Sequence, residues 1–387
     1  MTALPTTDTG SHRWWRRCLA VVALSAVTVV GLEGLLIIAD TWLVAGPYVY
    51  DRALGARYRP RQDGANRFGF NDVERPLHKP QGVFRLLVLG DSFSWAGGTS
   101  GNYIPRLERA FEEHYGAHVV DIVNAGYPGT HTGEQLQLLK AIGLQFDPDA
   151  VVLGFFAGND FHDAGPSRRR VAVNGLYVDL NTQYDFETAL WGRPLVSRSR
   201  LALLTWYTWQ RVRETWRRPS AADVALLSEQ SYLDTKRAYL RFYHRPTYQQ
   251  GTYARHVELI FTSVSAMRQV LAARRIPLLV AILPDELSVD PTVSQLVFSR
   301  FQLDPSEYDL TLPQQILEQY LAAEGIPFVD LTVAFRTGQP HHPLYLPRDG
   351  HWNDAGNALA AEALFPPLLR FVKEHSTNAD GRLMAGR

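Results

Sequence analysis

The sequence predicts a three-layer α/β domain in which helices cover both faces of a parallel β-sheet. Over most of residues 83–375, short apolar runs alternate with longer amphipathic ones, which is the pattern of repeated β–α–β units. The run 150–156 is almost entirely apolar, as a strand buried on both faces must be. Several of these runs also lead into glycine-containing polar loops, and parallel sheets bind ligands at the carboxyl ends of their strands.

The individual elements follow in the order that this fold requires. Strands are expected at 84–89, 118–123, 150–156, 277–283 and 327–331. Helices are expected at 103–115, 135–144, 257–273 and 313–323, with a last helix after about residue 354.

The alternation is interrupted by an insertion at about 161–252. Within 169–179, Asn174-Gly175 separates two β-prone runs and predicts a hairpin. The stretch 201–217 is aromatic and basic and carries three tryptophans at roughly helical spacing, Trp206, Trp209 and Trp216. It is interpreted foremost as a helix that docks the insertion on its domain. A surface that stacks on carbohydrate and a helix at a membrane interface are the alternatives.

Composition excludes several classes of protein. The chain has 387 residues with 39 basic and 39 acidic side chains, so it lacks the basic excess typical of nucleic-acid binding. Its single cysteine, Cys18, excludes an intramolecular disulfide and a cysteine-based metal cluster. His341, His342, His351 and Asp354 are close in sequence but lack metal-ligand spacing, so no metal site and no cofactor are predicted.

The segment 19–39 predicts a membrane anchor. It has 21 residues with one charge and no proline, enough to span a bilayer core of roughly 30 Å as a helix. Arginines and tryptophans precede it, which favours a cytoplasmic N-terminus: Arg13, Trp14, Trp15, Arg16 and Arg17. Arg52, Arg57, Arg59 and Arg61 on the other side oppose that orientation. A cleaved signal peptide is the rival interpretation, but the apolar run is long and no convincing cleavage site follows within it.

The one charge inside this segment is Glu33. An ionisable side chain at membrane depth is costly, and it usually faces water or a partner helix. The simpler interpretation is that Glu33 is protonated or reaches water; the alternative is contact with a membrane-protein partner. The expected domain organisation begins with a cytoplasmic N-terminus (1–18), the anchor (19–39) and a lead-in that packs onto the domain (40–82). The α/β domain (83–375) and a flexible tail (376–387) follow.

Four short blocks carry side chains suited to acyl chemistry. Gly90-Asp91-Ser92 follows the first strand, where a serine hydroxyl would be presented as a nucleophile. The block 123–130 follows the second strand and contains glycines that free backbone amides to face a ligand. Asn159, after the third strand, offers a side-chain amide to an oxyanion. His351 lies two residues after Asp349, and a carboxylate so placed orients an imidazole as a base. Singly, each block reads equally well as a turn or a helix cap.

Together and in this order, the blocks resemble the SGNH/GDSL hydrolase superfamily over about 84–373, with the insertion outside the match. The resemblance implies a flavodoxin-like three-layer fold, with Ser92 as nucleophile, His351 as general base and Asp349 orienting it. It also implies an oxyanion hole made by the Ser92 amide, the Gly129 amide and the Asn159 side chain. Gly129 is preferred to Gly126 because the family's donor glycine usually lies five residues after the asparagine of its block, here Asn124.

One feature departs from the family pattern. Most members have aspartate three residues before the histidine, whereas this chain has Arg348 there and its aspartate at two. The Asp-x-His-Trp arrangement is similar to the alginate O-acetyltransferase-related branch, although there the pair precedes the serine in the chain. The Asp349–His351 contact is therefore the part of the triad that the sequence specifies least.

Three functions are open from these residues. The first, which we favour, is an extracytoplasmic serine esterase that removes acyl groups, most plausibly acetyl, from a carbohydrate or a small ester. The second is an O-acetyltransferase that modifies an exported polysaccharide through the same acyl-enzyme. The third is a catalytically inactive glycan-binding scaffold, which would not need the full Ser/Gly/Asn/His set.

Overall fold

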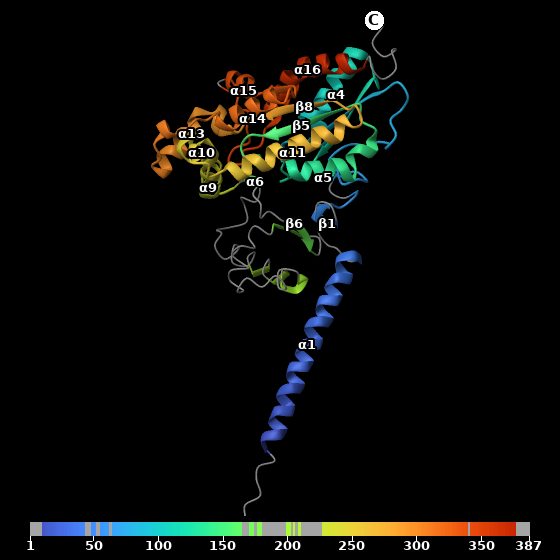
Figure 1. Ribbon diagram of the computed structural model, residues 1–387, viewed down its shortest axis with the longest axis vertical. Helices are drawn as coiled ribbons and strands as arrows, with labels where there is room; N and C mark the ends of the chain where they lie inside the picture. The colour runs from blue at the N-terminus through green and yellow to red at the C-terminus, as the bar shows by residue number, and fades with distance from the viewer. Residues whose placement is uncertain are drawn as a thin grey trace, which may run out of the picture. The chain divides into compact units, whose positions relative to one another are not determined.

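The computed structural model describes residues 10–42, 48–51, 55–61, 64–164, 170–173, 176–179, 199–202, 204–205, 208–209, 227–339 and 341–376 (Figure 1). The chain divides into two compact units, each described by itself below. One contains residues 1–57 and 169–219, and the other contains 58–168 and 220–387. The insertion is therefore shared: its part from 220 onward groups with the α/β unit. The expected tail lies almost wholly outside the described residues.

The α/β unit is built on a five-stranded parallel sheet, as predicted. Its strand order is β4-β3-β5-β8-β9, so β3 lies between β4 and β5. The strands are β3 (Phe84–Gly90), β4 (Val120–Gly126), β5 (Ala150–Phe156), β8 (Leu278–Leu283) and β9 (Phe328–Asp330). β4 starts two residues later than expected because His118 adopts a left-handed conformation, with φ 65°. β3, β5 and β8 are buried along their whole length.

Helices cover both faces of this sheet, which gives the three predicted layers. α4 (Tyr103–Tyr115) and α16 (Asp354–Ser376) pack together on one face, and α5 (Thr132–Ala141) and α11 (Ala254–Ala272) pack together on the other (Figure 1). α5 begins three residues before the expected position because His131 and Glu134 form a capping box there. α14 (Leu312–Ala323) lies close to its predicted bounds.

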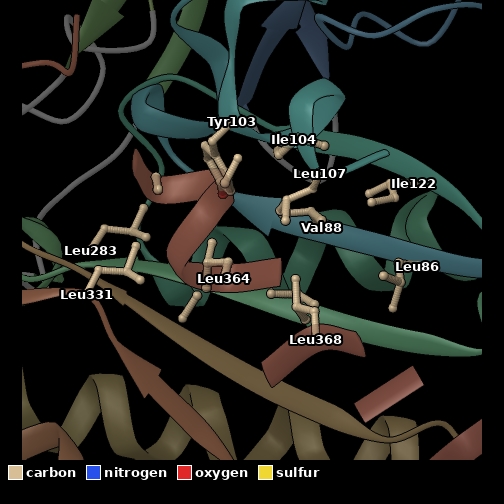
Figure 2. Close-up of a cluster of buried hydrophobic side chains, with 14 of the residues drawn as sticks. Leu86, Val88, Tyr103, Ile104, Leu107, Ile122, Leu283, Leu331, Leu364 and Leu368 are labelled. Atoms are coloured by element: carbon tan, nitrogen blue, oxygen red, sulfur yellow. The ribbon is translucent and has the colours of Figure 1, made fainter. Parts of the chain in front are cut away.

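The core on the α4–α16 face follows from the two-residue period of the strands. Leu86 and Val88 of β3 point to this face, where Leu107 of α4 and Leu364 and Leu368 of α16 meet them (Figure 2). Leu364 and Leu368 are four residues apart and so lie on one side of their helix. Each of these side chains is at most 2% exposed. Such packing fixes the strand ends that carry the candidate site.

Several further helices lie in the α/β unit, and the sequence did not predict most of them. They are α2 (Ser92–Trp95), α3 (Gly98–Gly101), α6 (Asp160–Asp163), α9 (Glu229–Leu240), α10 (Arg245–Gln249), α12 (Glu286–Val289), α13 (Pro291–Phe301) and α15 (Thr332–Gly338). Among the described residues of this unit, 3₁₀ turns lie at Gly143–Phe146, Arg241–Tyr243 and Pro305–Glu307.

The other unit contains the apolar N-terminal helix and two small strand pairs. α1 (Gly10–Trp42) includes the span Trp14–Ala39, which among the described residues is the one helix long and apolar enough to cross a membrane. β1 (Tyr48–Asp51) pairs with β2 (Gly55–Tyr58). β6 (Arg170–Val173) pairs with β7 (Leu176–Asp179) in antiparallel register, which confirms the predicted hairpin. Of the three tryptophans in 201–217, only Trp209 is among the described residues.

Candidate active site

The turn after β3 holds Ser92 at the carboxyl edge of the sheet. β3 ends at Gly90 and α2 begins at Ser92, so only Asp91 separates strand from helix. The Phe93 amide donates to Asp91 Oδ1 at 2.9 Å, which caps the short helix. Gly90 is required because a Cβ there would meet Ser94 Oγ at 2.2 Å. The tight turn leaves the Ser92 side chain half-buried at the edge.

The structure brings Ser92 together with Asp349 and His351, which lie more than 250 residues later in the sequence. His351 Nε2 lies 2.8 Å from Ser92 Oγ, within hydrogen-bond distance. His351 Nδ1 hydrogen-bonds Asp349 Oδ1, and the His351 amide donates to the same oxygen at 3.1 Å. The hydrogen bond from His351 lowers the pKa of the Asp349 carboxyl, against the effect of partial burial. The carboxylate therefore stays ionised and favours the tautomer that carries its proton on Nδ1.

The backbone of the His351 loop explains how an aspartate two residues away reaches the imidazole. Arg348 has φ 53° and Gly350 has φ 90°, so left-handed residues flank Asp349 on both sides. The Leu346 amide donates to the His351 carbonyl at 2.8 Å and closes the loop. These two bends turn the Asp349 side chain back toward the ring. Arg348 occupies the position where most family members have aspartate, and its left-handed backbone conformation forms one of the two bends of this loop.

Gly129 and Asn159 follow the two strands that flank β3. Gly129 comes after β4 and has φ 67°, in a turn that the Thr130 amide closes on the Tyr127 carbonyl at 3.2 Å. The Gly126 amide, by contrast, donates to Asn124 Oδ1 at 2.9 Å and is occupied within its own loop. Asn159 comes after β5 and precedes α6. Its Oδ1 is buried without a hydrogen-bond partner in the described part of the chain.

Aromatic rings support the imidazole. The Phe93 ring lies 5.1 Å from the His351 ring and 5.0 Å from the Trp352 ring, measured between centroids. Phe93 also packs against Phe156 at 4.1 Å, so the strand-end turn, β5 and the histidine loop share one buried cluster. Because this cluster is apolar, the His351 ring is held mainly by packing on one side and by Asp349 on the other.

The family comparison agrees with this geometry. A family model described as "GDSL-like Lipase/Acylhydrolase family" matches residues 88–359, well over half of the chain. The chain belongs to the GDSL-like lipase/acylhydrolase family. It is therefore a hydrolase of the SGNH type, and the prediction of the superfamily is confirmed. No curated protein matches it in sequence.

Solved structures of this class are similar at low identity. An acetyl xylan esterase is 15% identical with a TM-score of 0.39, and the match covers 74% of this chain and all of that one. A lipase/acylhydrolase from Enterococcus faecalis is 14% identical with a TM-score of 0.37, covering 76% of this chain and 96% of the other. Family membership rests on the family model rather than on these scores.

In this GDSL-like chain, helix α9 contributes residues to the surroundings of the candidate site. It belongs to the insertion at about 161–252, which was expected to lie outside the family resemblance. Lys236 is 2% exposed, and its Nζ lies 2.6 Å from Asp285 Oδ1 and 3.3 Å from Glu286 Oε2. A Cβ on Gly350 would lie only 3.3 Å from Nζ, so the ammonium group sits against the loop between Asp349 and His351. Burial disfavours this charge, but the two carboxylates outweigh it and raise the pKa of Lys236.

A second α9 residue, Tyr239, lies near Asn159: burial raises the pKa of the Tyr239 hydroxyl, and the Asn159 side chain acts in the opposite direction. The insertion therefore reaches both the histidine loop and the proposed oxyanion side of the GDSL-like site. One signal in the sequence could have found it: Tyr232, Leu233, Lys236 and Leu240 form the buried face of α9, so a lysine stands on an otherwise apolar helix face.

Asp91, next to the serine, is a buried carboxyl with a raised pKa. It is 1% exposed, and burial raises its pKa to about 6, although the Phe93 amide and the charge of His351 act in the opposite direction. Its Oδ2 has no hydrogen-bond partner among the described residues. Relative to an exposed aspartate, its surroundings therefore shift Asp91 toward its neutral form.

The lead-in before β3 also supports the site. Tyr58 stacks on Trp95 of α2, with 4.2 Å between ring centroids. Asn71 donates to the Trp95 carbonyl at 2.7 Å, and Asp72 accepts from the Asn124 amide at 3.1 Å. Within the described ranges, no group of three or more His, Cys, Asp or Glu side chains is placed to hold a metal ion.

Proposed function

We propose that this protein is a serine esterase that works through an acyl-enzyme on Ser92. The observation that carries the proposal is the continuous hydrogen-bonded path from Ser92 Oγ through His351 to Asp349, with 2.8 Å between Oγ and Nε2. A serine, an imidazole and a carboxylate in this order are the elements of an activated nucleophile.

The roles follow from this path. His351 Nε2 accepts the Ser92 proton as Oγ bonds to the ester carbonyl carbon, and the carbonyl oxygen becomes an oxyanion. We assign the Ser92 amide, the Gly129 amide and the Asn159 side-chain NH₂ as donors to that oxygen. The His351 proton then passes to the leaving alkoxide as the ester bond breaks. Water repeats the sequence, so that the acid is released and Ser92 regains its proton.

We further propose that the substrate is an O-acetyl group on an extracytoplasmic carbohydrate or a small ester. The extracytoplasmic part of this proposal is supported by the apolar span Trp14–Ala39 and the arginines before it, which we take as a retained anchor with a cytoplasmic N-terminus. That orientation places the α/β unit outside the cytoplasm, in contact with the cell envelope. The assigned chemistry uses no cofactor.

The test is release of p-nitrophenol from p-nitrophenyl acetate by the full chain in detergent or nanodiscs. Ser92→Ala should reduce turnover on the order of a million-fold, whereas Ser100→Ala, a matched change at an exposed serine, should leave it unchanged. An oligosaccharide acceptor is included in parallel. Acetyl appearing on the acceptor would favour the O-acetyltransferase alternative. Absence of both release and phosphonate labelling of Ser92 would contradict the proposal.

A further inference from the structure

Glu33 lies inside the apolar span but near one end of it. The span runs from Trp14 to Ala39, so at about 1.5 Å per residue the carboxylate is about 10 Å from its midpoint. A bilayer core of roughly 30 Å centred on this span places Glu33 about 5 Å below the outer hydrocarbon boundary. This step rests on the retained anchor of the proposed function.

At that depth, the donors that surround Glu33 come from residues 199–201 of its own chain and unit. Ser199 Oγ donates to Glu33 Oε2 at 2.9 Å, the Arg200 amide to Oε1 at 2.6 Å and the Leu201 amide to Oε2 at 3.0 Å. Both carboxylate oxygens therefore accept hydrogen bonds. These bonds offset the cost of a charge at membrane depth. The membrane-protein partner that was the alternative interpretation of Glu33 is not needed to satisfy the carboxylate.

The residues that follow are suited to the same depth. Residues 200–202 are helical, and Thr205 Oγ1 donates to the Leu201 carbonyl at 2.7 Å, so this hydroxyl has a partner within the segment. The side chains between Leu201 and Leu204 are apolar. Trp209 is 50% exposed, and tryptophan is enriched at membrane interfaces.

We propose that the described residues of this stretch (199–202, 204–205 and 208–209) are a membrane-interface segment that contacts phospholipid beside the anchor, fixed there by the Glu33 hydrogen bonds. The tie to Glu33 sets its depth within the 5–10 Å below the headgroups that interfacial helices occupy. The sequence continues with Arg211, Arg213, Arg217 and Arg218 against one acid, Glu214, which complements anionic headgroups. Three interpretations of 201–217 were open. Hydrogen bonding to Glu33 below the hydrocarbon boundary favours the membrane-interface helix, because neither a docking helix nor a carbohydrate surface requires a contact at that depth.

The test places a nitroxide at Thr205→Cys, an exposed position, in a Cys18→Ser background of the full chain. Nanodiscs of mixed phosphatidylcholine and phosphatidylglycerol hold the protein, and collision with oxygen is compared with collision with a water-soluble nickel chelate. Two matched controls carry the label at valines of similar exposure: Val30→Cys in the anchor, 71% exposed, and Val333→Cys in the α/β unit, 72% exposed.

We expect the oxygen-to-nickel ratio at 205 to exceed that at 333 several-fold and to approach that at 30. A ratio equal to that at 333, or a label that neither reagent reaches, would overturn the proposal in favour of a water-facing or protein-docked segment. Glu33→Leu should shift the ratio at 205 toward that at 333, and no shift would contradict the role of Glu33. Glu33→Gln, which keeps one acceptor oxygen, should shift it less.

Esterase activity separates this proposal from the function itself. Glu33→Leu should leave release of p-nitrophenol unchanged, because Glu33 belongs to the other unit. Ser92→Ala should abolish release and leave the label at 205 at the same depth. Failure of one assay without the other therefore identifies which proposal is wrong.

Discussion

The turn that presents Ser92 and the loop that presents His351 each place a carboxyl group beside the side chain they position, but in opposite electrostatic settings. Asp91 is completely buried, and its pKa rises to about 6. Asp349 is 30% exposed in its side chain, and the hydrogen bond from His351 lowers its pKa. Burial thus shifts one carboxyl toward its neutral form, and hydrogen bonding shifts the other toward its anion. Burial dominates at Asp91, where Oδ2 has no partner among the described residues, and hydrogen bonding dominates at Asp349, where the His351 imidazole donates.

Of the predictions that test this comparison, the largest effect on kcat should come from removing the charge of Asp349. Asp349→Asn keeps the shape of the side chain but replaces a carboxylate, which only accepts hydrogen bonds, with an amide that can also donate to Nδ1. This favours the His351 tautomer that carries its proton on Nε2, which cannot accept the Ser92 proton. We expect kcat to fall about 10⁴-fold, as is typical when a triad aspartate becomes asparagine. Steady-state kinetics on p-nitrophenyl acetate measure it. Asp234→Asn, at an exposed position, is the matched control, and full activity in Asp349→Asn would mean that another group orients His351.

The next effect tests the strand end that lies beside the Ser92 turn. Asn159→Ala removes the proposed side-chain donor to the oxyanion and should lower kcat roughly 100- to 1000-fold with little change in KM. Asn159→Asp, nearly isosteric but negatively charged, should lose at least as much. Retained activity in both variants would remove Asn159 from the oxyanion hole.

The buried carboxyl can be tested through stability. Because its pKa is raised in the folded state, Asp91 contributes stability below about pH 4 that is lost as the pH rises through about 6. Asp91→Asn keeps an acceptor for the Phe93 amide and removes this dependence. We therefore expect the variant to gain up to about 3 kcal/mol in unfolding free energy relative to the wild type between pH 4 and pH 7. Urea denaturation at both pH values measures the gain, and an equal difference at both would contradict the assignment.

The smallest effect concerns Lys236, which we regard as a positioning residue for the His351 loop. The hydrogen bond from His351 is the main cause of the low Asp349 pKa, and the charge of Lys236 adds to it. Removing that charge in Lys236→Met should favour protonation of the hydrogen-bonded Asp349–His351 pair and move the acid limb of the kcat/KM profile to higher pH. Activity at the acid end should fall several-fold. Lys236→Arg keeps the charge and should restore the limb. Melting curves identify the temperature range in which both variants are folded, and an unmoved limb there would leave Lys236 a purely structural role.

The sequence was a good guide to the candidate site residues at the strand ends. Ser92 and Asn159 could be located because β3 and β5 are unmistakable apolar runs, and parallel strands bring their carboxyl ends to one edge. The Asp349–His351 spacing was the uncertain point. It is explained by left-handed backbone at Arg348, a conformation that residue type alone does not predict for arginine.

The contribution of α9 could not be predicted from the sequence in the same way. Lys236 and Tyr239 belong to α9, which follows a long interruption of the α/β pattern in the sequence. Nothing in the spacing of Lys236 from Asp285 specifies that contact, which depends on tertiary packing. Likewise, Glu33 stood out as an anomaly, whereas its partners at 199–201 lie more than 160 residues away.

The stack of Tyr58 on Trp95 has a practical consequence for where the enzyme can be cut. Residues 58–82 precede β3, the first strand of the parallel sheet in the chain, yet Tyr58, Asn71 and Asp72 contact α2 or the end of β4. Removing them would expose the Trp95 ring and leave the Asn124 amide without its acceptor. An anchor-free enzyme that keeps its active site should therefore begin ahead of Tyr58, and a protease that cleaves between Tyr58 and Phe84 should inactivate it without touching a catalytic residue.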